Sequence, residues 1–341
     1  MIPINSIPGN RMSTINRRSL AFVHKTPVLY NFLTTLRAQY WTPEAINLSK
    51  EKTTFRKLDP LTQTAVFDIN AFFGTSDGYV IKNIQDNFFK DLEQFPEVSQ
   101  VLLSIAANEL IHSETYKNVI ASICEKESDF EDFIDSSIKY DAIRDIHDWI
   151  EKYMNTNTHY LERCLAFVAL EGLIFSSCFA YIHNLKAQIR NDSMQGLIDS
   201  NEYIAKDEGV HTDFGITLYR LFTTPGTEYF LYDRLPEETV KKIFTEAVDL
   251  ADKFIHWYMS GVDHQTIKIS ELQDYVKHIA NEIVGEESGL GYGKMYDVKN
   301  PFEWMFSLGL SAKTNFFEKH DANYRKDIKS QIDWDSPLSN Y

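Results

Sequence analysis

Two copies of one four-residue pattern each place a carboxylate and an imidazole one helical turn apart. They are Glu109-Leu110-Ile111-His112 and Glu208-Gly209-Val210-His211, and no other Glu-x-x-His occurs in the 341 residues. Residues three apart on a helix share a face, so each pair can hold a metal ion from one side. Two-metal carboxylate bundles combine two such pairs with one carboxylate from each of two further helices. The pattern therefore predicts a two-metal site and calls for two more acids.

Two acidic residues fit this requirement because each is surrounded in the sequence by apolar residues. Glu171 stands inside the apolar run at 164–182, and Asp77 follows Phe73 by one helical turn. Burying a lone carboxylate is costly, and a bound cation removes that cost. A single Glu-x-x-His usually marks a solvated helix face, but two pairs with two such acids favour a metal site. The predicted ligands are Asp77, Glu109 and His112 for one metal, and Glu171, Glu208 and His211 for the other.

These donors suit two iron ions per chain, and manganese is a second option. Glu109 and Glu208 are the expected bridging ligands.

One further residue, Tyr116, suggests a function for such a metal centre. Tyr116 lies four positions after His112, which keeps both on one helical stripe.

Apolar residues near the other predicted ligands can enclose the Tyr116 phenol. Phe175 and Phe179 follow Glu171 by four and eight positions, and Ile204 precedes Glu208 by four. A phenol that is shielded from water beside an oxidising metal pair can hold a long-lived radical.

The elements that position these residues are predicted to be helices. Helical periodicity dominates, and sustained period-two alternation is not found, so the fold class is all-α. Prolines and a Pro-Gly pair mark the breaks. The apolar positions from 243 to 258 cover one helix face and predict packing. The expected helices span residues 26–38, 60–86, 94–124, 138–152, 156–187, 193–220, 236–259 and 268–287.

The composition predicts one large helical domain. With 43% hydrophobic residues the chain can bury a sizeable core, which we place at 26–318 between an N-terminal segment (1–25) and a flexible C-terminal tail (319–341). The net charge of −15 argues against nucleic acid or an anionic membrane surface as a partner. The three cysteines show no Cys-x-x-Cys spacing, as is typical of a reducing cytoplasm.

The apolar run at 164–182 also approaches the length of a membrane span, roughly 20 residues. Glu171 lies in its middle, where a carboxylate costs about 2.5–3.5 kcal/mol on insertion scales. No second apolar run of this length accompanies it. We therefore predict a helix buried within the protein and no membrane association.

Several stretches closely resemble the small, radical-generating subunit of class I ribonucleotide reductase. Their sequences are most similar to those of the eukaryotic-type and viral members. The resemblance covers almost the whole chain. It implies a ferritin-like bundle with a di-iron site in its core, a homodimer, the six ligands above, a stable radical at Tyr116 and a pocket of Phe175, Phe179 and Ile204. The matching stretches are YWTPEAINLSK (40–50), AFFGTSDGYV (71–80), NELIHSETY (108–116), ALEGLIFSSCFA (169–180), AKDEGVHTDF (205–214), NPFEWM (300–305) and KTNFFEK (313–319).

The same resemblance implies a route out of the site. Trp41 and Asp207 match the family's electron and proton relay, which runs through His112, and Tyr324 matches a mobile relay tyrosine. The family's C-terminal tail binds the large subunit, to which the oxidising equivalent passes and where ribonucleoside diphosphates are reduced. No Gly-rich phosphate loop or dinucleotide fingerprint occurs in this chain.

Three alternatives stay open at the level of sequence. The first is the manganese-dependent class Ib small subunit, which needs a flavoprotein to supply its oxidant. The second is a stand-alone di-iron oxidase or desaturase with its own substrate channel. The third is an iron-storage or structural bundle, which would have no use for Tyr116 or for a tail that binds a partner.

Overall fold

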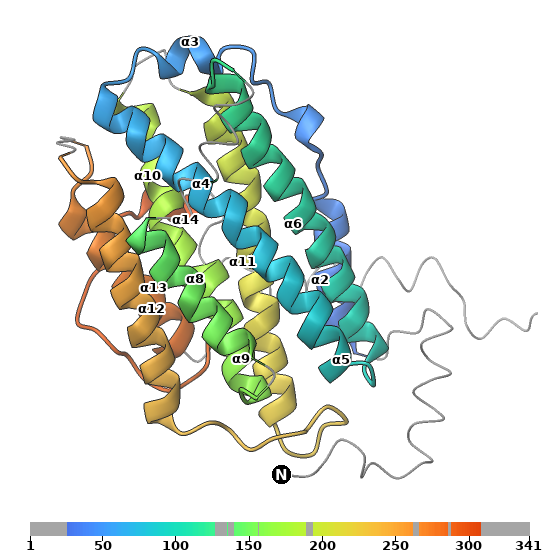
Figure 1. Cartoon of the computed structure of the whole chain (residues 1–341). Coiled ribbons are helices and arrows are strands. Elements are labelled where there is room, and N and C mark those ends of the chain that lie inside the picture. Colours follow the sequence, from blue (N-terminus) through green and yellow to red (C-terminus); the bar gives the residue numbers. More distant parts are fainter. Residues whose placement is uncertain are drawn as a thin grey trace, which may run out of the picture.

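The computed structural model describes residues 26–126, 135, 140–155, 157–188, 194–261, 266–285 and 288–307. Every regular element in these ranges is helical, and the long helices lie side by side in one bundle (Figure 1). The predicted all-α class is thus confirmed. In chain order, the elements are α2 (Pro27–Ala38), the short 3-10 helix η2 (Pro43–Ala45), α3 (Glu51–Phe55), α4 (Pro60–Asn83), the π-helix η3 (Ile84–Phe88), α5 (Phe89–Asp91), α6 (Pro96–Ile123), α8 (Asp141–Met154), α9 (Tyr160–Val168), the π-helix η4 (Ala169–Ile174), α10 (Phe175–Gln188), α11 (Gln195–Thr223), α12 (Glu237–Tyr258), α13 (Ile269–Gly285) and α14 (Trp304–Ser307).

The eight predicted helices are present, with ends that differ by a few residues. Proline marks three of the starts: Pro27, Pro60 and Pro96 occupy the first positions of α2, α4 and α6, where a missing N–H costs nothing. Asp59 caps α4 by accepting hydrogen bonds from the N–H groups of Leu61 and Thr62. The short helices α3, α5 and α14 were not predicted, because three to five residues are too few to show a helical period.

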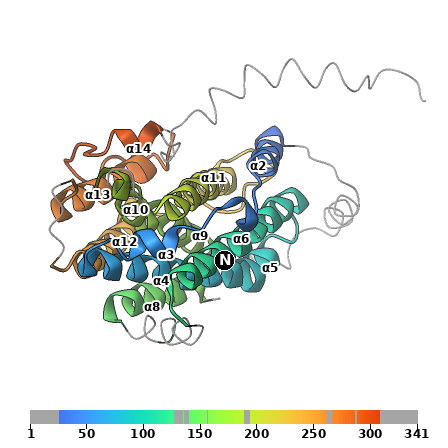
Figure 2. The same cartoon turned by 90° about the horizontal axis from the view of Figure 1, so that it is seen from above.

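Helix α11 contacts several other helices of the bundle. It packs against α2 and α6 on one side and against α9 and α10 on another. Figure 2 shows this arrangement from above, with α13 beyond α10. Side chains on several faces of α11 are therefore buried, which allows one helix to serve both a metal site and the core.

The predicted packing face of α12 is confirmed, since its eight positions 243, 244, 247, 248, 251, 254, 255 and 258 are all buried. The helical stretch Tyr160–Ala187 is long and apolar enough to cross a membrane, but 94% of its most apolar window is buried inside the protein. It is a core helix, as Glu171 at its centre predicted.

None of the three cysteines forms a disulfide, and Cys164 and Cys178 are buried in this core. The segments 1–25 and 319–341 lie outside the described residues, so the predicted domain boundaries stay predictions.

One buried acid outside the metal region carries a pH-dependent prediction. Asp68 on α4 is buried, and burial raises its pKa from 3.8 to about 7. Its contribution to stability is complete below its unfolded pKa and is lost as the pH rises through about 7. We expect Asp68→Asn to raise the Tm more at pH 8 than at pH 5, since each pKa unit is equivalent to about 1.4 kcal/mol.

Thermal unfolding at the two pH values checks this prediction. Asp274→Asn, at an exposed position of α13, is the control and should show no such difference. A stabilisation of Asp68→Asn that is as large at pH 5 as at pH 8 would contradict the assignment.

Candidate metal centre

The six predicted ligands converge in the interior of the bundle from four elements. Asp77 comes from α4, the first Glu-x-x-His from α6, Glu171 from η4, and the second Glu-x-x-His from α11. All six side chains are buried, with at most 2% of any residue exposed. The donors that the sequence separates by up to 134 positions thus meet in one place.

The ligand atoms form two overlapping groups. Within each group they lie no more than 4.8 Å apart, and Glu109 belongs to both. The imidazoles of His112 and His211 lie nearly parallel, with ring centroids 6.0 Å apart. The spacing fits two ions held side by side. The groups are Asp77, Glu109 and His112, and Glu109, Glu171, Glu208 and His211.

Two carboxylates reach both imidazoles. Glu109 Oε1 lies 2.9 Å from His211 Nδ1, and Glu109 Oε2 lies 3.6 Å from His112 Nδ1. Glu208 places one oxygen 3.0 Å from each of these two nitrogens. Both acids therefore stand where a bridging ligand would have to stand, and both imidazoles direct Nδ1 toward the carboxylates.

The unsatisfied polar atoms of the centre show that a cation fits it. Both oxygens of Asp77 are buried and form no hydrogen bond with the described residues, and those of Glu109 have only their contacts with the His112 and His211 imidazoles there. Such atoms are costly to bury unless they are paired. Four carboxylates and two imidazoles are donors that suit iron or manganese.

The pKa shifts report the same concentration of negative charge. Burial, and then the charge of Glu109, raise the pKa of Asp77 well above its usual value, and burial and Glu208 do the same for Glu171. Burial lowers the pKa of His211, but the surrounding carboxylates, Glu208 above all, outweigh it and the net pKa is raised. Burial opposes ionisation of Glu208 too, yet its contacts with Glu171 and His211 hold its pKa below the usual range.

Glu171 lies on an unusual stretch of backbone. The π-helix η4 interrupts the otherwise α-helical segment from Tyr160 to Gln188, and such interruptions are frequent at functional sites. The next residue, Gly172, faces Thr212 on α11 so closely that a Cβ atom would come within 2.6 Å of the Thr212 methyl group. Glycine therefore lets η4 and α11 approach closely enough to bring Glu171 beside Glu208 and His211.

A hydrogen-bonded chain leads away from the centre on the side of His112. His112 Nε2 lies 3.1 Å from Asp207 Oδ2, and Trp41 Nε1 donates to the same oxygen at 2.9 Å. With its Nε2–H donated to Asp207, His112 keeps the lone pair of Nδ1 for a metal. The structure thus brings together Trp41, Asp207 and His112.

Tyr116 is buried at the edge of an aromatic cluster. It is 1% exposed, and its hydroxyl has no hydrogen-bond partner among the described residues. The ring of Phe73 stacks on it at 4.8 Å, and Phe73 in turn contacts Phe175 at 5.1 Å and Phe179 at 5.0 Å. Burial, followed by the nearby charges of the acids, raises the pKa of Tyr116 well above 10.

Phe73 is a member of this pocket that the sequence did not assign. Its signal was its position one turn before Asp77, which places both side chains on the same face of α4. Ile204 is buried one turn before Glu208 on α11. Tyr324 lies outside the described residues, so its role stays a prediction.

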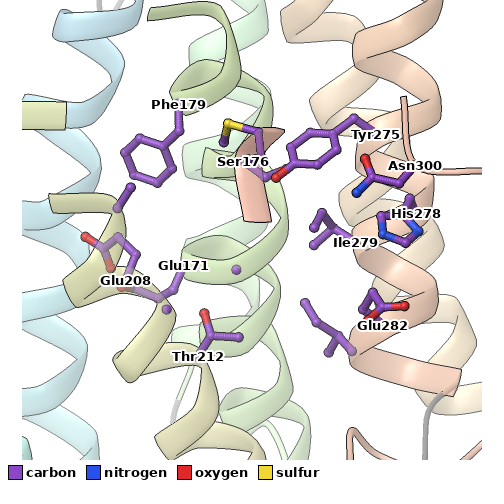
Figure 3. A pocket seen from close by; sticks show the side chains of 15 residues that line it. Glu171, Ser176, Phe179, Glu208, Thr212, Tyr275, His278, Ile279, Glu282 and Asn300 are labelled. Atoms are coloured by element: carbon purple, nitrogen blue, oxygen red, sulfur yellow. The ribbon is translucent and has the colours of Figure 1, made fainter. Parts of the chain in front are cut away.

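A cavity borders the second ligand group, the one that contains Glu171 and Glu208. Glu171 and Glu208 line one side of it, and Tyr275, His278 and Glu282 of α13 line the other (Figure 3). The carboxylates of Glu171 and Glu208 thus face a cavity whose other wall is α13.

Comparison with known proteins identifies the family. The family model of the ribonucleotide reductase small chain matches residues 18–301. The ribonucleoside-diphosphate reductase small chain of Variola virus is 33% identical over 307 residues, which are 89% of this chain and 91% of that protein. The corresponding chain of Plasmodium falciparum (isolate Dd2) is 32% identical over 302 residues, 88% of this chain and 81% of the relative.

Solved structures show the same fold. A putative class I ribonucleotide reductase from Bacillus halodurans superposes with a TM-score of 0.69 at 22% identity, over 83% of this chain and all of that one. The Rnr4 homodimer of Saccharomyces cerevisiae gives 0.68 at 24% identity, over 89% and 88% of the two chains. The dimanganese(II)-NrdF of Streptococcus sanguinis gives 0.70 at 17% identity, over 85% and 98%. The ferritin-like bundle and the eukaryotic and viral resemblance are confirmed, and the chain belongs to the small-chain family of ribonucleotide reductase, as the small subunit of a ribonucleoside-diphosphate reductase.

Proposed function

We propose that this small subunit generates a stable radical at Tyr116 beside a di-iron centre and transfers the oxidising equivalent of that radical to the large subunit. The observation that carries the proposal is the position of the Tyr116 phenol. It is buried, free of hydrogen bonds to the described residues and stacked on Phe73 of an aromatic cluster, on the helix that also supplies Glu109 and His112. When bound, two iron ions would supply the oxidising equivalent, drawn from dioxygen, that removes one electron and one proton from this phenol.

The residues of the chain have separate tasks in this proposal. The two ligand groups would hold the ions: Asp77, Glu109 and His112 one of them, and Glu109, Glu171, Glu208 and His211 the other. The raised pKa of Tyr116 keeps the reduced phenol protonated, so the electron and the proton have to leave together. The surrounding Phe73, Phe175 and Phe179 keep water from the radical, and Ile204 is a further proposed member of this pocket.

The route to the partner starts at His112. Asp207 accepts hydrogen bonds from both His112 and Trp41, which makes one carboxylate the link between the centre and the indole. We propose that Trp41 and Asp207 relay the oxidising equivalent, that Tyr324 in the tail at 319–341 continues the route, and that this tail binds the large subunit. A homodimer and a cytoplasmic location complete the proposal, supported respectively by the homodimeric yeast relative and by three cysteines that form no disulfide.

Metal content and electron paramagnetic resonance test the proposed function. The full-length protein, reconstituted with iron and dioxygen, should bind two ions per chain and give a tyrosyl signal. Its addition to the large subunit should produce ribonucleotide reduction. A tyrosyl signal that arises only with manganese and a flavoprotein would assign the chain to the manganese-dependent class instead, and binding of metal without any radical would refute the proposal.

Trp41→Phe tests the relay. The replacement keeps an aromatic ring but removes the N–H that donates to Asp207. We expect metal content and the Tyr116 signal to be retained, and turnover with the large subunit to fall by about a hundredfold or more, as for a residue needed only in the reacting complex.

The chain offers a matched control for this change. Trp149 is similarly buried, and its Nε1 also donates to a carboxylate, Glu246, at 2.9 Å. Trp149→Phe should leave turnover near the wild-type value. Equal losses in the two variants would show that the effect of Trp41→Phe is structural.

A further inference from the structure

Three aromatic rings follow one another from the metal centre to the protein surface. His112 stacks with Trp41 at a centroid distance of 6.1 Å and an interplanar angle of 19°, and Trp41 stacks with Tyr203 at 5.4 Å and 25°. Exposure rises along the series, from 0% for His112 to 8% for Trp41 and 43% for Tyr203. Tyr203 is thus the outermost ring of this stack.

The position of Tyr203 is coupled to that of Asp207. The two residues are four apart on α11, so they lie on the same face of the helix. Asp207 binds the Trp41 N–H while Tyr203 covers the indole ring, and α11 therefore holds Trp41 through two adjacent side chains. The ammonium group of Lys206 lies 5.8 Å from the centroid of the Tyr203 ring.

An apolar side chain could cover the indole equally well, but Tyr203 adds an oxidisable phenol in van der Waals contact with it and open to water. We propose that Tyr203 is a further redox residue, through which the oxidising equivalent leaves Trp41 for the surface. The proposal rests on the proposed function, because the oxidant in it is the Tyr116 radical.

The proposed transfer conserves electrons and protons. Trp41 gives one electron to the Tyr116 radical, which also takes up one proton drawn from water, so that its O–H bond forms again. The oxidised indole then takes one electron from Tyr203, whose O–H bond breaks and whose proton passes to water at the exposed face. The net change is the loss of one hydrogen atom from Tyr203 and the gain of one by Tyr116, with Trp41 restored.

Two replacements separate a redox role from a covering role. Tyr203→Phe keeps the ring on Trp41 and removes the phenol, whereas Tyr203→Leu removes both. In the full-length iron-loaded protein with its large subunit and substrate, we expect Tyr203→Phe to keep wild-type metal content and Tyr116 signal. Its turnover should fall by about tenfold or more, equivalent to ~1.4 kcal/mol of barrier. Tyr40→Phe is the control, because Tyr40 is 61% exposed and adjoins Trp41 in the chain but has no ring contact with it among the described residues.

A radical trap supplies a readout that a covering role would not change. With 3-aminotyrosine at position 203, mixing with the large subunit and substrate should give an aminotyrosyl resonance signal while the Tyr116 signal declines. Wild-type turnover in Tyr203→Phe without a trapped radical would overturn the proposal, as would a loss confined to Tyr203→Leu. Absence of any tyrosyl signal from the wild-type protein would instead refute the proposed function itself, and this inference with it.

Discussion

Tyr116→Phe is expected to fold, to bind its metals and to give no tyrosyl resonance signal, and its ribonucleotide reduction should fall to the detection limit. The replacement keeps the ring that stacks on Phe73 and removes one hydroxyl oxygen, which has no hydrogen-bond partner among the described residues. Loss of such an atom leaves no buried group unpaired, so the stability should change by no more than about 1 kcal/mol. Electron paramagnetic resonance, metal analysis and thermal unfolding of the same preparation check the three parts.

A second buried tyrosine provides the control. Tyr160 on α9 is 5% exposed and is packed against Phe88 and Phe222, away from the six ligands. Tyr160→Phe should retain the radical and the activity. A tyrosyl signal that survives in Tyr116→Phe would place the radical on another residue and refute the assignment.

Glu109→Gln is expected to have the largest effect on metal binding. Glu109 contributes to both ligand groups and lies within 2.9 Å of His211 and 3.6 Å of His112. The amide keeps the size of the side chain but loses its charge, so both ions lose a ligand. We expect metal content to fall well below that of the wild type, and the rise in Tm on adding metal to disappear, because a ligand stabilises the fold only to the extent that it binds.

Two further variants make this prediction specific. Asp77→Asn alters only the first ligand group. It should therefore weaken the binding of one ion and leave more metal bound than Glu109→Gln does. Glu97→Gln alters another buried glutamate of α6 outside the centre and should bind metal as the wild type does. Full metal content in Glu109→Gln would show that this residue is not a shared ligand.

Much of the fold and of the ligand set was predictable from the sequence, because both depend on local periodicity. The 3.6-residue period placed the helices to within a few residues and put Glu109 with His112, and Glu208 with His211, on single faces. Isolation among apolar neighbours singled out Asp77 and Glu171. The resemblance to a known family added Trp41 and Asp207, whose roles local periodicity cannot indicate.

The tertiary structure alone decided how these faces meet. That Glu109 belongs to both metal groups, that Phe73 stacks on Tyr116, and that Tyr203 covers Trp41 are contacts between different elements. The helical period determines on which face of its helix a side chain lies. The distance from that side chain to one on a neighbouring helix depends on the packing angle and the rotamers. Trp41 and Asp207, for example, are 166 residues apart and share a hydrogen bond only because α11 packs beside the segment that follows α2. The sequence by itself determined the candidate donors of a two-metal centre, and the packing of α4, α6, η4 and α11 determined their mutual distances and the hydrogen-bonded chain that leads away from them.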